Sequence, residues 1–374
     1  GKYDVLLAVS ADQTLNDKEY QWIKNFTLIF TSLLINESNL NKFGVMSYSG
    51  HNKTQISPLD TSYSTNYAAV IQSIKQLSRQ TPEIRTDVYL NSILNIFDTE
   101  YSNSPKAAII LQNENSTSRR STQSAAWEAY KHGVNLLVLG VEQDIADSEM
   151  NAISYFTKEH TTRISSEDLL GTDGLKWTLN TLKTNCYGAA ELAFAMDASI
   201  SLDKDYFEAI KETVATTIRY LNISDDMFRV RVVLTFNGSV EIVAQDETSK
   251  EALIQKVEEA ILTGGPNKIF LAINKTTEHL LKAPQRKVKK IAVIITDGKS
   301  LDRQLTIKEA KYAAENNIIN IAMAIGDELS VSLSGLMDVV ANKTENIIWL
   351  KTFEELRLYG AKQLLTHICN SKCL

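Results

Sequence analysis

The sequence predicts an α/β protein made of two tandem, doubly wound domains. We expect each domain to hold a mostly parallel central sheet with one antiparallel edge strand and flanking helices. Three observations predict this class. The chain of 374 residues exceeds the usual size of one domain, its two halves resemble each other, and short apolar runs alternate with amphipathic segments.

The two halves of the chain match when one is shifted by about 185 residues, which indicates a tandem repeat. "DVLLAVSADQT" then lies over "ELAFAMDASIS", "KAAIILQNENS" over "KIAVIITDGKS", and "HGVNLLVLGVE" over "NNIINIAMAIGD". The spacing holds over most of each half. We therefore place one domain at residues 1–185 and the other at 186–374, with the boundary inside "KTNCYGAAEL".

The apolar pattern inside each copy separates strands from helices. In the second copy "LAFAM" and "IAVII" are apolar throughout, which is typical of parallel strands covered on both faces. The turn "FNGS" between two strand-like runs predicts a hairpin, and therefore one antiparallel edge strand. One face of a helix is predicted from apolar residues at steps of three and four: Phe207, Ile210, Val214, Ile218 and Leu221.

Composition and motifs exclude several classes of function. A net charge of -6 argues against a nucleic-acid partner, and no run approaches the roughly 20 apolar residues of a membrane span. No H-E-x-x-H, G-x-S-x-G or Walker motif is present. A phosphatase of the haloacid dehalogenase type would need a second Asp where Ser199 stands. We therefore expect a protein that is not an enzyme.

Sequons and cysteine placement indicate a secreted glycoprotein. The chain has only three cysteines, one near its middle and two at its end. The candidate N-glycosylation sites are the Asn-x-Ser/Thr triplets at Asn25, Asn36, Asn52, Asn115, Asn222, Asn237, Asn274 and Asn342.

Oxygen-bearing side chains follow two predicted strands of the second copy. Asp197, Ser199 and Ser201 alternate in "DASIS", and Asp297 follows a later strand in "IITDGKS". The carboxyl ends of strands in an open α/β sheet are where ligands bind, and carboxylate and hydroxyl oxygens suit a hard divalent cation. Helix caps and a turn are the alternative reading of either motif alone. Both motifs together, in one repeated α/β unit, favour a cation site.

These motifs resemble the von Willebrand factor type A domain, whose shared site is the metal-ion-dependent adhesion site. The resemblance rests on D-x-S-x-S, a Gly-Gly loop and T-D-G, and it covers essentially the whole chain as two copies. It implies Asp197, Ser199, Ser201 and Asp297 as ligands, with Asn267 where the family has a threonine. Mg²⁺ is the expected ion, with Mn²⁺ and Ca²⁺ as alternatives. In the family, a carboxylate of the partner fills the open coordination position.

The first copy carries a degenerate version of this site. "SADQT" replaces D-x-S-x-S and "LQNENS" replaces T-D-G, so two carboxylates have moved or vanished. The alignment does not choose between two residues for the threonine position. We expect an empty or weak site, with capping of the next helix as the alternative role of Asp12 and Thr14. The candidate residues are Ser10, Asp12, Thr14, Thr86, Asp87 and Asn113.

The resemblance also implies a disulfide. Matrix members of the family often join the entry and exit of a domain, so Cys186 is expected to pair with Cys369 or Cys373. Closing that loop would stabilise the fold by about 5 kcal/mol as an upper figure. The remaining thiol would pair with another chain or stay reduced, which leaves disulfide-linked or weak self-association open.

The densest basic run, "KAPQRKVKK" at residues 282–290, precedes a predicted strand. We expect a solvated loop there. A sulfated glycan or an acidic partner is the alternative.

The resulting hypothesis is a secreted adhesion protein of the extracellular matrix. It would bind collagen or a collagen-like fibrous partner through its type A domains, helped by a divalent cation in the second domain, and would cross-bridge or organise fibres. Two alternatives remain. One is the ectodomain fragment of a cell-surface receptor, and the other is a structural spacer that needs no metal.

Overall fold

In a computed structural model, the chain forms two compact units, Gly1–Asn185 and Cys186–Leu374. The structure describes residues 3–10, 16–35, 40–49, 52–60, 67–79, 85–99, 102–141, 145–155, 160–165, 176–181, 189–199, 204–236, 239–245, 247, 249–265, 268–283, 286–327 and 329–370.

The first unit is a six-stranded sheet in the order β3-β2-β1-β4-β5-β6. All neighbouring strands run parallel except β2 and β3. Its strands are β1 (Tyr3–Ser10), β2 (Leu40–Ser49), β3 (Asn52–Asp60), β4 (Lys106–Gln112), β5 (Val134–Val141) and β6 (Thr161–Ile164). Its helices are α1 (Asp17–Ile35), α2 (Tyr67–Lys75), α3 (Thr86–Thr99), α4 (Arg119–Lys131) and α5 (Asp147–Ser154).

The second unit repeats this plan in the order β12-β11-β10-β7-β8-β9, and only β8 and β9 are antiparallel. Its strands are β7 (Ala190–Asp197), β8 (Phe228–Phe236), β9 (Ser239–Ala244), β10 (Lys289–Ile295), β11 (Ile318–Ile325) and β12 (Ile347–Leu350). Its helices are α7 (Lys204–Tyr220), α8 (Lys250–Glu258), α9 (Ile269–Lys282), α10 (Arg303–Glu315), α11 (Leu333–Val339) and α12 (Phe353–Asn370). The predicted fold class is confirmed for both copies.

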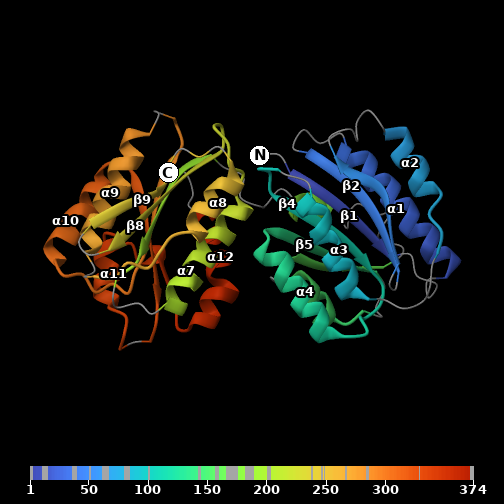
Figure 1. The fold of residues 1–374 in the computed structure, drawn as a ribbon. Helices are drawn as coiled ribbons and strands as arrows, with labels where there is room; N and C mark the ends of the chain where they lie inside the picture. The colour runs from blue at the N-terminus through green and yellow to red at the C-terminus, as the bar shows by residue number, and fades with distance from the viewer. Residues whose placement is uncertain are drawn as a thin grey trace. The chain divides into compact units, whose positions relative to one another are not determined.

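Helices cover both faces of the second sheet, with α9, α10 and α11 on one side and α7, α8 and α12 on the other (Figure 1). The central strand β7 divides its side chains accordingly. Phe194 belongs to the core beneath α7 and α12, while Ala193 and Ala195 face the core beneath α9 and α10. A strand buried on both faces must be apolar at consecutive positions, which explains the unbroken run in the sequence.

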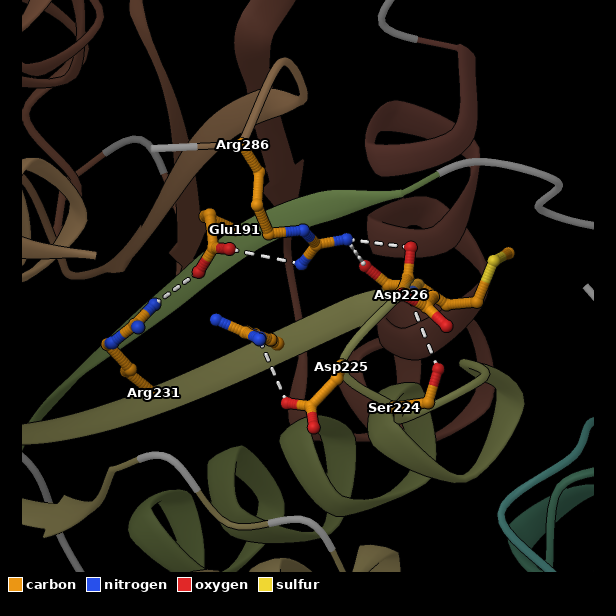
Figure 2. A network of polar contacts seen from close by, with 8 residues as sticks. Glu191, Ser224, Asp225, Asp226, Arg231 and Arg286 are labelled. Atoms are coloured by element: carbon orange, nitrogen blue, oxygen red, sulfur yellow. Dashed lines mark hydrogen bonds and ion pairs between the residues drawn. The ribbon is translucent and has the colours of Figure 1, made fainter. Parts of the chain in front are cut away.

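Part of the basic run has a structural role that the sequence did not indicate. Arg286 lies between α9 and β10, and its guanidinium contacts the buried carboxylate of Glu191 at 3.1 Å (Figure 2). It also donates to the backbone carbonyls of Asp226 and Met227, at 2.7 and 2.9 Å. Arg286 is therefore tied to the loop before β8 and is not a freely solvated cation.

Glu191 holds a second guanidinium on its other oxygen. Arg231 of β8 donates to Oε2 at 2.7 Å, and the side chains of both residues are at most 3% exposed. A buried charge without a partner is strongly destabilising, so the carboxylate and the guanidinium depend on each other. The network joins β7, β8 and the loop before β10 at the edge where β7 begins.

No helix among the described residues is long and apolar enough to cross a membrane.

We predict that Glu191→Gln lowers the free energy of unfolding of the second unit by about 3–5 kcal/mol, because Arg231 would stay buried without a counter-charge. Calorimetric unfolding of the full chain measures this loss. Asp225→Asn is the matched control, since it breaks the neighbouring ion pair between Asp225 and Arg229. The side chain of Asp225 is 74% exposed. That control should lose no more than about 1 kcal/mol. Equal losses in the two variants would contradict the role given to the network.

Candidate metal site

Asp197 is the last residue of β7 and is almost fully buried, with 2% of its surface exposed. Its Oδ1 accepts a hydrogen bond from the backbone N–H of Ser199 at 2.8 Å. Ser199 is 1% exposed. The strand end and the following turn therefore bring a carboxylate and a hydroxyl group together inside the protein.

Asp297 follows β10, the parallel neighbour of β7 in the sheet. Met196 and Ile295 are paired in that ladder, so the two aspartates leave the sheet at the same edge. The Oδ1 of Asp297 accepts from the N–H of Lys299 at 2.9 Å, which closes a turn through Gly298 at φ 78°. A side chain at Gly298 would place its Cβ 2.6 Å from the carbonyl oxygen of Ser332, so glycine is required there.

The Gly-Gly loop approaches the same edge. The N–H of Gly264 donates to the carbonyl of Ala198 at 2.9 Å, between Asp197 and Ser199 in the chain. Gly264 and Gly265 both have positive φ, at 78° and 92°, which glycine adopts without strain. The three sequence motifs thus meet around Asp197. Two further predicted ligands, Ser201 and Asn267, lie outside the described residues.

Burial raises the pKa of Asp197 to about 6. Hydrogen bonds from Ser199 lower it, and the negative charge of Asp297 raises it. A buried carboxylate beside a second one is favourable only with a proton or a cation nearby. Among the described residues, no three or more His, Cys, Asp or Glu side chains are grouped so that they could hold a metal ion by themselves. The donors fit an oxygen-liganded hard cation held by two carboxylates and hydroxyl groups.

The first unit places a neutral pair where the second has its aspartates. The hydroxyl of Ser10, at the end of β1, donates to Oδ1 of Asn113 at 2.9 Å. Ser10 is 0% exposed and Asn113 is 7% exposed. The two groups satisfy each other and carry no charge to attract a cation. Asp12 and Thr14 lie outside the described residues.

The alternatives for the threonine position in the first unit differ in environment. Thr86 is fully buried at the start of α3, and its Oγ1 accepts from the side-chain amide of Gln112 at 3.3 Å. Asp87 forms a two-point ion pair with Arg85, at 3.1 and 2.9 Å. The hydrogen bonds from Arg85 hold the pKa of Asp87 below its usual value. Thr86 faces the end of β4, whereas the carboxylate of Asp87 is bound to Arg85.

Sequence reasoning missed residues that fill this edge of the first unit. Tyr89 of α3 donates from its hydroxyl to Gln112 and stacks on Tyr48 at 3.9 Å between ring centroids. Buried Glu149 accepts from the N–H of Ser116 at 3.2 Å. Gln112 aligns with Thr296 when the two copies are compared. An amide side chain at the end of an otherwise apolar strand was the sequence signal that could have identified it.

Cys369 is disulfide-bonded, and both candidate partners, Cys186 and Cys373, lie outside the described residues. The pairing therefore stays a prediction.

The eight sequons also stay predictions. Asn36 and Asn237 lie outside the described residues, and Asn52 lies in β3. Asn25 and Asn274 lie within helices α1 and α9. Asn115 accepts from the N–H of Ala146 at 2.8 Å, and the carbonyl of Asn222 accepts from the N–H of Phe228 at 3.0 Å. Asn342 is exposed in the loop after α11.

Comparison with known sequences finds relatives among collagen chains. The chain is 25% identical to the collagen alpha-5(VI) chain of Mus musculus over 398 aligned positions, which cover 98% of this chain and 14% of that one. It is 31% identical to the collagen alpha-1(XXI) chain of Homo sapiens over 150 positions, which cover 39% of this chain and 15% of that one. The chain thus spans a small part of these relatives.

Among solved structures, the chain is similar to proximal thread matrix protein 1 from the mussel byssus. Its TM-score is 0.45 at 17% identity, and the match covers 98% of this chain and 96% of that one. Another structure of that protein is described with a zinc-occupied metal-ion-dependent adhesion site.

The family model of the von Willebrand factor type A domain matches residues 4–172 and again residues 191–358. The two matches coincide with the two sheets described above. The chain therefore belongs to the von Willebrand factor type A domain family.

Proposed function

We propose that this protein is a secreted matrix protein that binds collagen or a collagen-like fibrous partner. A divalent cation in the second domain would be held by Asp197, Ser199, Ser201 and Asp297, with Asn267 completing the set. The observation that carries the proposal is the pair of aspartates at one sheet edge, with Asp197 buried and its pKa raised. Relationship to collagen chains and the absence of enzyme motifs support it.

The contribution of the residues to binding follows from their charges. Two carboxylates balance a divalent cation without oversupplying negative charge, so a bound ion would still attract an acid group from outside. The cation supplies only that attraction, and no bond of the partner is broken. Asp197 and Asp297 are oriented by backbone N–H groups of their own turns, so the oxygen donors are positioned before any ligand arrives.

The first domain would serve as a second point of contact that needs no metal. Among the described residues of the corresponding edge, Ser10 and Asn113 stand in place of the two aspartates. Two modest contacts on one chain strengthen each other by raising the effective concentration of the second. This arrangement would suit a protein that organises fibres.

The direct test measures binding of the full chain to immobilised fibrillar collagen in Mg²⁺, in Mn²⁺ and in excess chelator. We expect chelation to weaken binding by about tenfold or more, equivalent to about 1.4 kcal/mol. Saturable binding that chelator leaves unchanged would favour a contact without metal. An absence of saturable binding would remove collagen as the partner.

The variant Asp197→Asn should distinguish the effect of cation binding from the stability of the ion-free fold. Because the pKa of Asp197 is raised in the folded state, the ion-free second domain should lose stability as pH rises from about 4 to 6 and regain it on acidification. The variant should lack that contribution, worth at most about 3 kcal/mol, and should also lose stabilisation by Mg²⁺ or Mn²⁺. Calorimetry measures both effects.

Asp327→Asn is the matched control for that variant, because it removes an exposed carboxylate from a neighbouring loop. The control should keep its response to the cation. If Asp197→Asn still binds the ion like the unmodified chain, the assignment is wrong.

A converse experiment installs the missing charges in the first domain. Ser10→Asp with Asn113→Asp should destabilise that domain without metal, since two like charges would then be buried. Added Mg²⁺ or Mn²⁺ should restore stability in a thermal unfolding assay. Ser10→Ala with Asn113→Ala is the control, which loses the same hydrogen bond and should not respond to metal. A double aspartate variant that is also indifferent to metal would show that the carboxylates do not limit this site.

A further inference from the structure

We propose that three exposed leucines beside the candidate cation site recognise an extended partner segment in which an acidic residue is followed by a bulky apolar one. The leucines are Leu301, Leu329 and Leu333, and we call them the leucine rim. The inference rests on the proposed function and deepens it, because it names the chemistry of the segment that the second domain would bind.

The leucine rim lies at the edge of the sheet that holds Asp197 and Asp297. Leu301 follows β10, Leu329 follows β11, and Leu333 opens α11. The strands β10 and β11 are parallel neighbours, so their carboxyl ends share that edge. The three side chains are 68%, 90% and 49% exposed, respectively, so this edge carries three exposed apolar side chains on neighbouring loops.

The loops that carry the leucines are in direct contact with each other. The N–H of Ser332 donates to the carbonyl of Asp297 at 2.9 Å. A Cβ at Gly335 would lie 1.9 Å from the carbonyl oxygen of Gly298, so the two backbones touch. This contact fixes the loop after β10 against the start of α11. The loops that carry the leucine rim are therefore held against the turn that contains Asp297.

The first domain shows that the fold does not require two of these leucines, Leu301 and Leu333. Thr306 donates to Ser300 at 2.9 Å, and Thr122 donates to Ser116 at the same distance, so the two loops correspond. By that correspondence, the exposed residue Thr117 stands where the second domain has Leu301.

The first residue of the short helices α5 and α11 shows the same change from a polar residue in the first domain to leucine in the second. Helix α5 begins with exposed Asp147, which pairs with Arg163, where α11 begins with Leu333. In the first domain, polar residues on these loops occur together with the neutral Ser10–Asn113 pair. In the second domain, leucines at the matching positions occur together with the paired aspartates. Since both copies keep the same fold, this coincidence points to binding and not to folding.

Charge complementarity determines the kind of occupant. Two aspartates with a divalent cation carry no net charge, and exposed Lys299 lies close enough to Asp327 to interact with its carboxylate, so the attraction for an acid group would come from the open position of the bound ion. An acid group is therefore attracted, while the leucines gain free energy only by covering apolar surface. A segment with Glu or Asp next to Leu, Phe or Met satisfies both demands at once.

The test compares two immobilised peptides, Gly-Gly-Glu-Leu-Gly-Gly and Gly-Gly-Glu-Ser-Gly-Gly, against the full chain in Mn²⁺. We expect the leucine peptide to bind about tenfold or more tightly, the usual discrimination of an apolar contact. A variant with Leu301→Thr, Leu329→Thr and Leu333→Thr should lose that difference and keep its affinity for the ion. Ile242→Thr, at an exposed position of β9 on the sheet's far edge, is the matched control and should bind as before.

Each other result overturns the inference. Equal binding of the two peptides, no binding of either, or a rim variant that still prefers the leucine peptide would each exclude it. A rim variant that changes only the sedimentation of the protein would mean that the surface pairs two copies of this chain. Calorimetric titration with Mn²⁺ in the same samples separates the two proposals. If the unmodified chain takes up no ion, the proposed metal function fails, whereas ion binding without a leucine effect removes the rim alone.

Discussion

The second domain depends on a geometric constraint of parallel sheets, which is that neighbouring strands deliver their carboxyl ends to one edge. Asp197 and Asp297 leave adjacent strands there, and each is held by a backbone N–H of its own turn. Desolvation of Asp197 is the largest cause of its raised pKa. The fold thus places negative charge where water is scarce, and a cation is the natural complement.

The internal duplication separates what the fold needs from what the site needs. In the first domain a hydroxyl and an amide replace the aspartates and satisfy each other. The surrounding space is occupied by Tyr89 and Gln112, which add uncharged hydrogen bonds. The sheet order and the single antiparallel pair are the same in both copies. The architecture therefore tolerates loss of the carboxylates, provided that the buried polar groups find other partners.

The sequence predicted the elements whose signals are local or repeated, and it missed contacts that join distant residues. Unbroken apolar runs identified the central strands, and the alignment of the two copies placed Ser10 at the position of Asp197 and Asn113 at the position of Asp297. No periodicity relates Glu191 to Arg286, which are 95 residues apart. The basic run looked solvated because its composition does not reveal that one arginine turns inward. Tyr89 was missed for the same reason, whereas Gln112 had a local signal, an amide at the end of an apolar strand.

Glu191 and Asp197, two buried carboxylates at opposite ends of β7, differ in the charges that surround them. Glu191, at the beginning of β7, is bound by two guanidiniums, one on each carboxylate oxygen. Asp197, at the other end of the same strand, receives a backbone N–H and faces a second negative charge. Full neutralisation makes the first group a structural tie. Burial and the charge of Asp297 raise the pKa of the second group, so the cation site that we propose lies at the opposite end of the strand from the structural ion pair.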